Sequence, residues 1–499
     1  MMACLCIDVG TSIIKTVAFD DRGRERVVVR QETTVLRPRP GFSEQDMNAV
    51  WEAVALTIRR VLADLGEPVR FLALTAQGDG AWLVDAAGRP TGPAILWNDA
   101  RATAVIERWR AAGTLTEAFR RNGTQSFAGL PNGIFAWLRE HDPERLERSH
   151  KSLCCGGWIF YNLTGRLAID ESDAAAPFFD VRARKYSPEL LALYGMPWAE
   201  RLLPDVLSDD RRVGELTSAA AAALGLPRGL PVVLSLYDVA STAIGLGTVG
   251  VGQGCSVLGT TLSTEIVVSE PRLDEEPSGF TLPFGPDLYL RAFPTLAGGE
   301  VIHWAMRQLG LGGPGELSEL AAQAPPGAGG LLCLPYFSPA GERVPFLNPC
   351  ARGSLHGMSF EHGREHLARA LFEGLSYVIR DCLLVASGSG AAALRQCGLS
   401  GGGANSELWC RIIADVLGVP TFRPRDQEVG AKGAMIVGLV ATGAEKSFAT
   451  AAQDYLEIRD TFEPDAGRHA LYREGFEQFM AVRGECLPIW QRMAGGTTC

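Results

Sequence analysis

The sequence predicts an α/β protein built from two lobes of similar plan. Its 499 residues exceed what one hydrophobic core usually organises, so two domains of about 250 residues are expected. An apolar strand, a tight turn with glycine and threonine, and a second strand occur at residues 6–15, and a similar element recurs at residues 256–263. Helices and strands alternate after both copies, which is the pattern of α/β domains.

The first half begins with strands and continues as an α/β alternation. Apolar and β-branched runs bounded by turn residues predict strands, and a longer run with helical spacing of apolar residues predicts a helix. The expected strands cover residues 3–9, 13–19, 26–33 and 71–75, and the expected helix covers residues 46–65. A further run at 230–235 predicts a buried strand that leads into a helix at Asp238. We place the boundary near residue 250, giving domains 1–250 and 251–499.

The second half repeats this order of elements. The expected strands cover residues 254–258, 262–268 and 394–399, and the expected helices cover residues 299–308, 361–386 and 405–417. Short segments rich in proline and glycine at 38–41, 310–315 and 325–330 predict loops. The glycine density of residues 246–254 predicts a hinge between the two domains.

Composition and charge exclude several classes of protein. The formal net charge of -10 argues against a nucleic-acid partner, which requires a basic face. The longest apolar region, residues 230–268, is interrupted by Asp238 and many glycines, whereas a membrane span needs about 20 nearly uninterrupted apolar residues. The N-terminus lacks the pattern of a signal peptide, so we expect a cytoplasmic protein without a membrane partner. No heptad repeat sets the oligomeric state, and a homodimer is left open.

The two glycine-threonine turns are suited to phosphate. Glycine lets the backbone approach closely, successive N–H groups form an anion-binding concavity, and hydroxyl groups add donors. The residues concerned are Gly10, Thr11 and Ser12 in the first copy and Gly259, Thr260 and Thr261 in the second. No G-x-x-x-x-G-K-S/T sequence is present, so a P-loop nucleotidase is disfavoured. Two such turns predict two lobes that grip one polyphosphate.

A third glycine-rich segment, residues 398–406, lies between a predicted strand and a predicted helix. It fits the G-x-S-x-G pattern of a hydrolase, but only His469 follows to complete a triad in that order. The better interpretation is a nucleotide turn, where Gly402 and Gly403 leave room for a purine or ribose and Asn405 caps the helix. The G-x-G-x-x-G at 245–250 follows a helical stretch, whereas a dinucleotide fingerprint needs a strand before it.

The chain resembles the FGGY-type carbohydrate kinases of the actin, hexokinase and heat-shock ATPase superfamily, over essentially its whole length. The segments that carry this resemblance, in the order of the family, are residues 8–12, 41–45, 77–79, 97–101, 162–165, 237–238, 259–261, 341–343, 351–353, 369–374 and 401–405. The resemblance implies two ribonuclease-H-like domains flanking a cleft, with the sugar on the first domain and ATP mainly on the second. It also implies Mg²⁺ as the metal ion.

The resemblance also implies roles for individual residues. Asp238 matches the catalytic base, although an aspartate at this position is also typical of a helix N-cap. Asp8 matches the carboxylate that holds Mg²⁺, although an aspartate ending a strand is also a common turn residue. The second turn, Gly259, Thr260 and Thr261, would line the γ-phosphate site. Gly402, Gly403 and Asn405 would face the adenosine.

The substrate side departs from well-known relatives. Glycerol kinases carry Gln-Arg-Glu where this chain has Gln77, Gly78 and Asp79, and the Met-His-Gly of D-xylulose kinases is absent. Asp79 can accept hydrogen bonds from a vicinal diol, and Gln77 can donate or accept. Trp97 can wall the site or belong to the core, and we expect Asp79, Trp97, Asp99 and Asp238 to converge on one small pocket.

The substrate that this pocket would take is a small polyol or a ketose. Residues 76–85 and 338–346 are similar to erythritol kinases, whereas residues 236–243 and 76–78 are similar to L-xylulose kinases. Erythritol is the favoured acceptor, and L-xylulose or another pentulose is the alternative. An actin-like ATPase without sugar-kinase activity is the less favoured alternative, from another class of protein.

Overall fold

The computed structural model describes residues 2–273, 276–388 and 394–493. Its contacts divide the chain into two compact units. Unit 1 comprises Met1–Val249, Ser269–Leu290 and Glu428–Leu456, and unit 2 comprises Gly250–Val268, Arg291–Gln427 and Glu457–Cys499. The first division falls next to residue 250, but two later segments return to unit 1, which a single boundary in the sequence does not describe. Each unit is described below by itself.

The framework of unit 1 is a six-stranded sheet in the order β13-β14-β5-β1-β2-β3. Its strands are β1 (Ala3–Val9), β2 (Ile13–Phe19), β3 (Glu25–Glu32), β5 (Val69–Ala76), β13 (Val213–Glu215) and β14 (Pro231–Leu234). β1 pairs antiparallel with β2 and parallel with β5, and β5 pairs parallel with β14. Apart from β13, which was not predicted, these bounds lie within a few residues of the predicted ones, because the apolar runs that predicted the strands are buried in the sheet.

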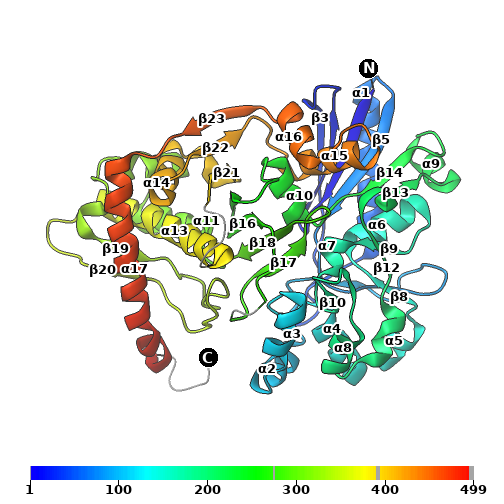
Figure 1. Ribbon diagram of the computed structural model, residues 1–499, viewed down its shortest axis with the longest axis horizontal. Helices are drawn as coiled ribbons and strands as arrows, with labels where there is room; N and C mark the ends of the chain where they lie inside the picture. The colour runs from blue at the N-terminus through cyan, green and yellow to red at the C-terminus, as the bar shows by residue number, and fades with distance from the viewer. Residues whose placement is uncertain (1, 274–275, 389–393, 494–499) are drawn as a thin grey trace. The chain divides into compact units, whose positions relative to one another are not determined.

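Helices cover both faces of this sheet, and the alternation of side chains along β1 assigns each residue to a face. Leu5, Ile7 and Val9 belong to one apolar cluster with Val54 and Ile58 of helix α1 (Met47–Leu65). Asp8 points to the opposite face, where Gly430 of helix α15 (Val429–Ala441) approaches its carboxylate. Figure 1 shows α15 in orange beside the blue strand β5, although the two elements are far apart in the chain.

Helix α10 (Asp238–Gly245) packs against α15 through glycines. A Cβ atom on Gly433 would lie 1.7 Å from the carbonyl oxygen of Ser241, and one on Gly245 would lie 1.9 Å from that of Val429. The two backbones therefore touch where no side chain separates them. This close contact holds the start of α10 against the central strands.

Unit 1 has further short elements for which the sequence analysis assigned no structure. They are β4 (Glu44–Gln45), β6 (Trp82–Val84), β7 (Ala94–Ile95), α2 (Thr103–Ala111), α3 (Thr114–Asn122), α4 (Pro131–His141), α5 (Pro143–Arg148), β8 (Lys151–Leu153), α6 (Cys155–Thr164), β9 (Ala168–Asp170), α7 (Glu171–Ala174), β10 (Phe179–Asp180), β11 (Lys185–Tyr186), α8 (Pro188–Leu193), β12 (Asp205–Leu207) and α9 (Ser218–Leu224). Apart from β4, which precedes β5, and α9, which follows β13, they lie in the long stretch between β5 and β13. Several of them share a second apolar cluster that includes Ile134, Phe135 and Leu190. Helix α6 packs on β5 and β14.

Unit 2 repeats the strand plan of unit 1. Its sheet contains the order β18-β16-β15-β21-β22-β23, with β15 antiparallel to β16 and parallel to β21. The strands are β15 (Gln253–Leu258), β16 (Leu262–Val268), β18 (Tyr289–Pro294), β21 (Gln396–Ser400), β22 (Thr421–Pro424) and β23 (Ile458–Phe462). This is the duplication that the two glycine-threonine turns predicted.

The helices of unit 2 are α11 (Gly299–Leu309), α12 (Pro314–Ala321), α13 (Arg364–Ser387), α14 (Glu407–Leu417) and α17 (Ala466–Met493). Three of them, α11, α13 and α14, follow the prediction closely, whereas α12 and α17 were not predicted. In Figure 1, α13 and α14 lie together and α17, in red, runs beside them. The predicted loop at 310–315 ends early because Pro314 begins α12, where proline suits the first helical turn.

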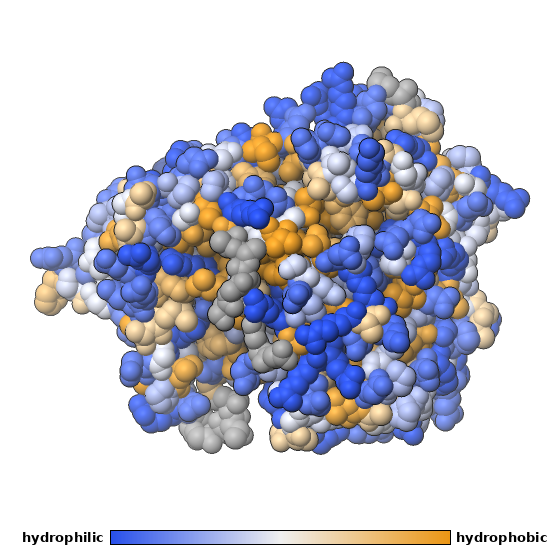
Figure 2. Space-filling model, in the orientation of Figure 1, coloured by the Kyte–Doolittle hydropathy of each residue, from blue (hydrophilic) through white to orange (hydrophobic). Residues whose placement is uncertain are grey.

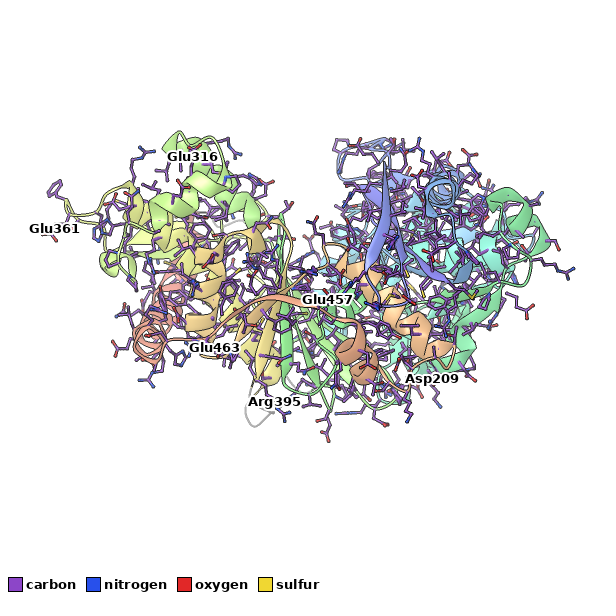
Figure 3. All side chains as sticks on the ribbon, turned by 90° about the horizontal axis from the view of Figure 1, so that it is seen from above. Asp209, Glu316, Glu361, Arg395, Glu457 and Glu463 are labelled. Carbon is purple, nitrogen blue, oxygen red and sulfur yellow. The ribbon has the colours of Figure 1, made fainter. Side chains whose placement is uncertain are left out.

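The face shown in Figure 2 is largely polar. Hydrophilic residues cover much of the face in Figure 2, with hydrophobic residues in patches between them. In Figure 3 the labelled side chains of Glu316 and Glu361 point outward from unit 2, and Asp209 lies at the outside of unit 1. Among the described residues, we find no helix with the length and apolarity needed to cross a membrane.

The glycine contact between α10 and α15 makes a prediction about stability. Gly433→Ala should lower the free energy of unfolding by at least about 1–3 kcal/mol, because the added methyl group forces the two helices apart. Denaturant unfolding measures this change. The control is Gly484→Ala in the middle of α17, where a Cβ atom would meet nothing within 4 Å; it should stabilise by up to about 1 kcal/mol. Equal stability of both variants would contradict the close packing.

Candidate active site

The polar residues of the first predicted site lie at the carboxyl ends of parallel strands in unit 1. β1 pairs with β5 so that Asp8 lies opposite Thr75, and β5 pairs with β14 so that Leu74 lies opposite Leu234. The segments after these strands therefore leave the sheet at one edge, the usual place for ligands in α/β proteins. Gln77 follows β5, and Asp238 follows β14.

Asp8 lies in a small cluster of charges at this edge. The Lys15 Nζ atom is 3.7 Å from Asp8 Oδ2 and 2.9 Å from Glu428 Oε2, and Arg30 also pairs with Glu428. Burial raises the pKa of Asp8, and Glu428 adds to this effect, whereas Lys15 opposes it. Burial lowers the pKa of Lys15, but the two carboxylates outweigh it and the net pKa is raised. The sequence analysis missed Glu428, because only the packing of α15 brings it here.

A hydrogen-bonded network joins the first turn to the predicted substrate side. Thr11 Oγ1 donates to Gln77 Oε1 at 2.7 Å and accepts from Trp97 Nε1 at 2.9 Å. Gln77 Nε2 donates to Gln45 Oε1 at 2.8 Å. Gln77 is only 4% exposed, so both ends of its amide serve to position neighbouring residues. The network sets the shape of the turn formed by Gly10, Thr11 and Ser12, whose Ser12 side chain is exposed.

Gly78 and Asp79 lie directly against Tyr237, the residue before Asp238. A Cβ atom on Gly78 would lie 2.4 Å from the Tyr237 ring and 2.8 Å from Asp173 Oδ1. The Tyr237 hydroxyl donates to Asp79 Oδ2 at 3.4 Å. Asp79 adopts a left-handed backbone conformation with φ of 55°, which is uncommon outside glycine and is often seen at functional sites.

Asp238 is the first residue of α10, and Tyr237 occupies the N-cap position. The N-cap interpretation of Asp238 is therefore wrong by one residue, and its carboxylate lies in the first turn, where the helix dipole favours a negative charge. Burial raises the pKa of the Cys155 thiol, and the charges of Asp173, Asp238 and Asp8 add to this effect. The charges of these three carboxylates are thus felt at the start of α6.

Asp173 lies beside Gly78, and the sequence analysis did not single it out. Burial raises its pKa well above the usual range, and Asp170, Asp79 and Asp238 add to this shift. Its Oδ1 atom and the Tyr186 hydroxyl are buried and have no hydrogen-bond partner among the described residues. Both residues and Asp79 line a cavity with a volume of ≈ 40 Å³, which is room for a few water molecules.

Asp99 does not join this group, contrary to the expectation that it converges with Asp79 and Asp238. Its carboxylate accepts hydrogen bonds from the Arg101 guanidinium at 2.9 Å and from the Ser43 backbone at 2.7 Å. Both partners and Asp99 itself, which is 2% exposed, are part of the framework. An aspartate is suited to a binding site, but the buried Arg101 already occupies the hydrogen-bonding positions of this carboxylate.

In unit 2, the second turn and the third glycine-rich segment lie at the ends of neighbouring parallel strands. β15 pairs with β21 so that Val257 lies opposite Ser400. The turn of Gly259, Thr260 and Thr261 joins β15 to β16 and has both threonines exposed. Its carbonyl groups accept hydrogen bonds from the first residues of α11, at 2.9 Å for Gly259 and 3.0 Å for Thr260.

The glycine-rich segment forms a short 3₁₀ helix, η4 (Gly402–Asn405), between β21 and α14. Ser406 caps α14 by accepting from the backbone of Trp409, so the predicted cap by Asn405 is wrong by one residue. Gly403 cannot carry a side chain, because its Cβ atom would lie 2.4 Å from the Trp409 ring. Gly402 has open space around its Cβ position and is exposed, as is Asn405.

Comparison with known families shows what kind of protein this is. A model of the FGGY family of carbohydrate kinases matches residues 3–245 with its N-terminal domain and residues 254–442 with its C-terminal domain. The chain belongs to the FGGY family of carbohydrate kinases. It is therefore a phosphotransferase, as the resemblance implied, and the two-domain α/β fold is confirmed.

Named relatives of this FGGY kinase differ in their substrates. The chain is 32% identical to an erythritol kinase of Brucella abortus, covering 98% of this chain and 97% of the relative. It is 30% identical to an L-xylulose/3-keto-L-gulonate kinase of Escherichia coli, covering 95% of both. Its fold matches a ligand-bound xylulose kinase of Lactobacillus acidophilus with a TM-score of 0.93 at 22% identity over 99% of this chain.

Membership of a kinase family implies ATP with a metal ion, typically Mg²⁺. Among the described residues, no group of three or more histidines, cysteines, aspartates or glutamates is placed to hold a metal ion. Mg²⁺ usually needs only one or two carboxylates and takes its other ligands from phosphate and water. Asp8 fits this requirement. Glu428 lies near it, because Lys15 pairs with both carboxylates.

The framework role of Asp99 makes a prediction that separates it from the site. Asp99→Ala should lower the free energy of unfolding by about 3 kcal/mol, the low end for a broken buried pair, because Glu44 still compensates Arg101. The KM for the acceptor should not change. Glu117→Ala, which breaks the exposed pair with Arg120, is the control and should alter stability little. A raised KM with unchanged stability would instead place Asp99 in the site.

Proposed function

We propose that this FGGY kinase transfers the γ-phosphate of ATP to a terminal hydroxyl of a small uncharged polyol or ketose, with erythritol as the favoured acceptor. The observation that carries the proposal is the grouping of Asp8, Asp79 and Asp238 at one sheet edge of unit 1. Each carboxylate matches a different need of the reaction: metal binding, acceptor binding and proton removal.

The charge of this region supports an uncharged acceptor. The charges of Asp79, Asp170 and Asp238 all raise the pKa of Asp173. Those of Asp8 and Asp238 both raise the pKa of Cys155. The charges of Asp79 and Asp238 repel an anionic acceptor such as a sugar acid. The two carboxylates suit hydroxyl groups, which donate hydrogen bonds to carboxylates.

The reaction needs a base for the acceptor hydroxyl and charge compensation for the phosphates. Asp238 takes the proton of the hydroxyl as its oxygen forms a bond to the γ-phosphorus. The bond from this phosphorus to the bridging oxygen of the β-phosphate breaks, and ADP leaves with the electron pair. Asp8 would hold Mg²⁺, which offsets the charge on the phosphates. The turn of Gly259, Thr260 and Thr261 offers backbone N–H and hydroxyl donors to the γ-phosphate.

A second acceptor class, L-xylulose or another pentulose, is supported by the relative from Escherichia coli. The discriminating experiment measures phosphorylation of erythritol, glycerol, L-xylulose, D-xylulose and D-ribulose. The highest kcat/KM on erythritol would support the first candidate, and the highest value on L-xylulose would support the second. ADP release that does not depend on any acceptor would instead support an ATPase.

The role of Asp238 is tested by Asp238→Asn. We expect phosphorylation to fall by about a hundredfold or more, the scale for a lost general base, while ATP binding stays nearly intact. The control is Asp64→Asn, at an exposed position on α1, which should leave turnover unchanged. Normal turnover of Asp238→Asn would rule this residue out as the base.

The adenosine assignment is tested at Gly402, because a methyl group there meets no protein atom within 4 Å. We expect Gly402→Ala to leave the melting temperature unchanged but to raise the KM for ATP about fivefold or more, by crowding the nucleotide. The KM for the acceptor should not move. Gly315→Ala, at an equally open position of unit 2, is the control. An unchanged KM for ATP would place the adenosine elsewhere.

A further inference from the structure

We propose that Tyr237 and Gly78 form a matched pair that selects the acceptor, in which the Tyr237 ring occupies the space beside Gly78 and its hydroxyl positions Asp79. This inference rests on the proposed function and names residues that decide its specificity. Tyr237 is a positioning residue, because it acts through Asp79 and borders the proposed base.

The steric half of the pair is the contact between the ring and Gly78. A Cβ atom on Gly78 would lie 2.4 Å from Tyr237 Cε2 and 2.5 Å from Cδ2, far inside the ordinary contact distance of about 3.5–4.0 Å. Gly78 has no left-handed φ, so its backbone would accept other residues. Glycine is required here by the closely packed neighbours, the Tyr237 ring first and Asp173 Oδ1 at 2.8 Å second, and not by the turn.

The backbone of Tyr237 is anchored by buried groups. Its N–H donates to Ser172 Oγ at 2.9 Å, and this hydroxyl donates in turn to Asp170. Arg212 donates to the other oxygen of Asp170 at 2.6 Å and to the Leu234 carbonyl at 3.2 Å. The end of β14, the ring and the start of α10 are thereby held together, so the ring cannot easily leave Gly78.

The polar half of the pair is the contact between the phenol and Asp79. The hydroxyl lies 3.4 Å from Asp79 Oδ2, which is longer than the usual O–H···O distance of about 2.5–3.0 Å. Hydrogen bonds of this kind often tighten when the substrate binds. The phenol thus links the acceptor-binding carboxylate to Asp238, the next residue along the chain.

The pair restricts what can occupy the acceptor position. Because the ring leaves no space for a side chain at position 78, this position contributes no side chain to acceptor binding. Recognition then falls to Asp79 and the phenol. Both groups bind hydroxyls, and a rigid ring leaves little room for a branched or bulky acceptor. The pair therefore selects small acceptors with free hydroxyl groups. A larger residue at 78 would require a smaller one at 237.

The first experiment uses Tyr237→Phe, which keeps the ring and removes the hydroxyl. We expect the KM for the acceptor to rise about tenfold, the scale of a lost hydrogen bond to a charged group, with the KM for ATP unchanged. Tyr161→Phe is the matched control, since its hydroxyl donates to the Ala87 carbonyl at the surface. An unchanged KM for the acceptor in Tyr237→Phe would overturn the inference.

The second experiment tests the steric match by exchanging size across the pair. Gly78→Ala should lower kcat/KM for the acceptor at least about tenfold, because the methyl group displaces the ring. The same change should cost less in a Tyr237→Ala background, where the ring is gone and the contact with Asp173 Oδ1 at 2.8 Å remains. An equal loss in both backgrounds would overturn the match. ATP binding and unfolding curves check that each variant is folded. If Gly78→Ala does not fold, the result for Tyr237→Phe alone tests the inference.

These measurements also separate this inference from the proposed function. If the wild-type protein phosphorylates none of the five acceptors, the proposed function fails and the inference falls with it. If the wild-type protein is active but Tyr237→Phe has the same KM for the acceptor, only the inference fails.

Discussion

The parallel pairing of β1, β5 and β14 is the constraint on which the first half of the site depends. Backbone hydrogen bonds hold the three strands in register, so the segments that follow them must leave the sheet at one edge. Because side chains alternate along a strand, a shift of one residue in β1 would turn Asp8 away from α15 and into the apolar cluster under α1. The register therefore determines both the core and the polar edge.

The packing of α15 adds what the sheet cannot supply. Glycine contacts between α10 and α15 bring a late segment of the chain against the first strands, and Glu428 arrives beside Lys15 and Asp8. The same contacts hold the start of α10, where Asp238 lies. The absence of side chains at the helix crossing thus positions both Glu428, beside Asp8, and Asp238, the proposed base.

The region around Asp173 shows a conflict between stability and function. Burying a carboxylate near others costs free energy, as the raised pKa of Asp173 indicates, and a structural protein would gain by replacing it. Such local conflicts are expected where a protein binds a ligand. Here the carboxylates suit hydroxyl groups and a metal ion, which explains why the cluster is compatible with a kinase.

Sequence reasoning recovered most of the framework because burial leaves local patterns. The bounds of β1, β2 and β16 were predicted to the residue, since each is an apolar run bounded by turn residues. Residues 76–230 were not assigned, because their elements are short and carry weak periodicity. Motifs predict Asp8, Asp79 and Asp238 as site residues, and this stays a prediction, whereas Asp99 had the right residue type but pairs with Arg101.

By itself, the sequence determined the α/β class, the duplicated turn and the membership of the kinase family, because these features are written in local patterns and in the order of motifs. Only the tertiary structure decided which polar residues meet. Gln77 is held within a hydrogen-bonded network, Glu428 joins Asp8, and Tyr237 takes the space beside Gly78. These outcomes depend on contacts between distant segments, and the spacing of residues along a chain carries no record of them.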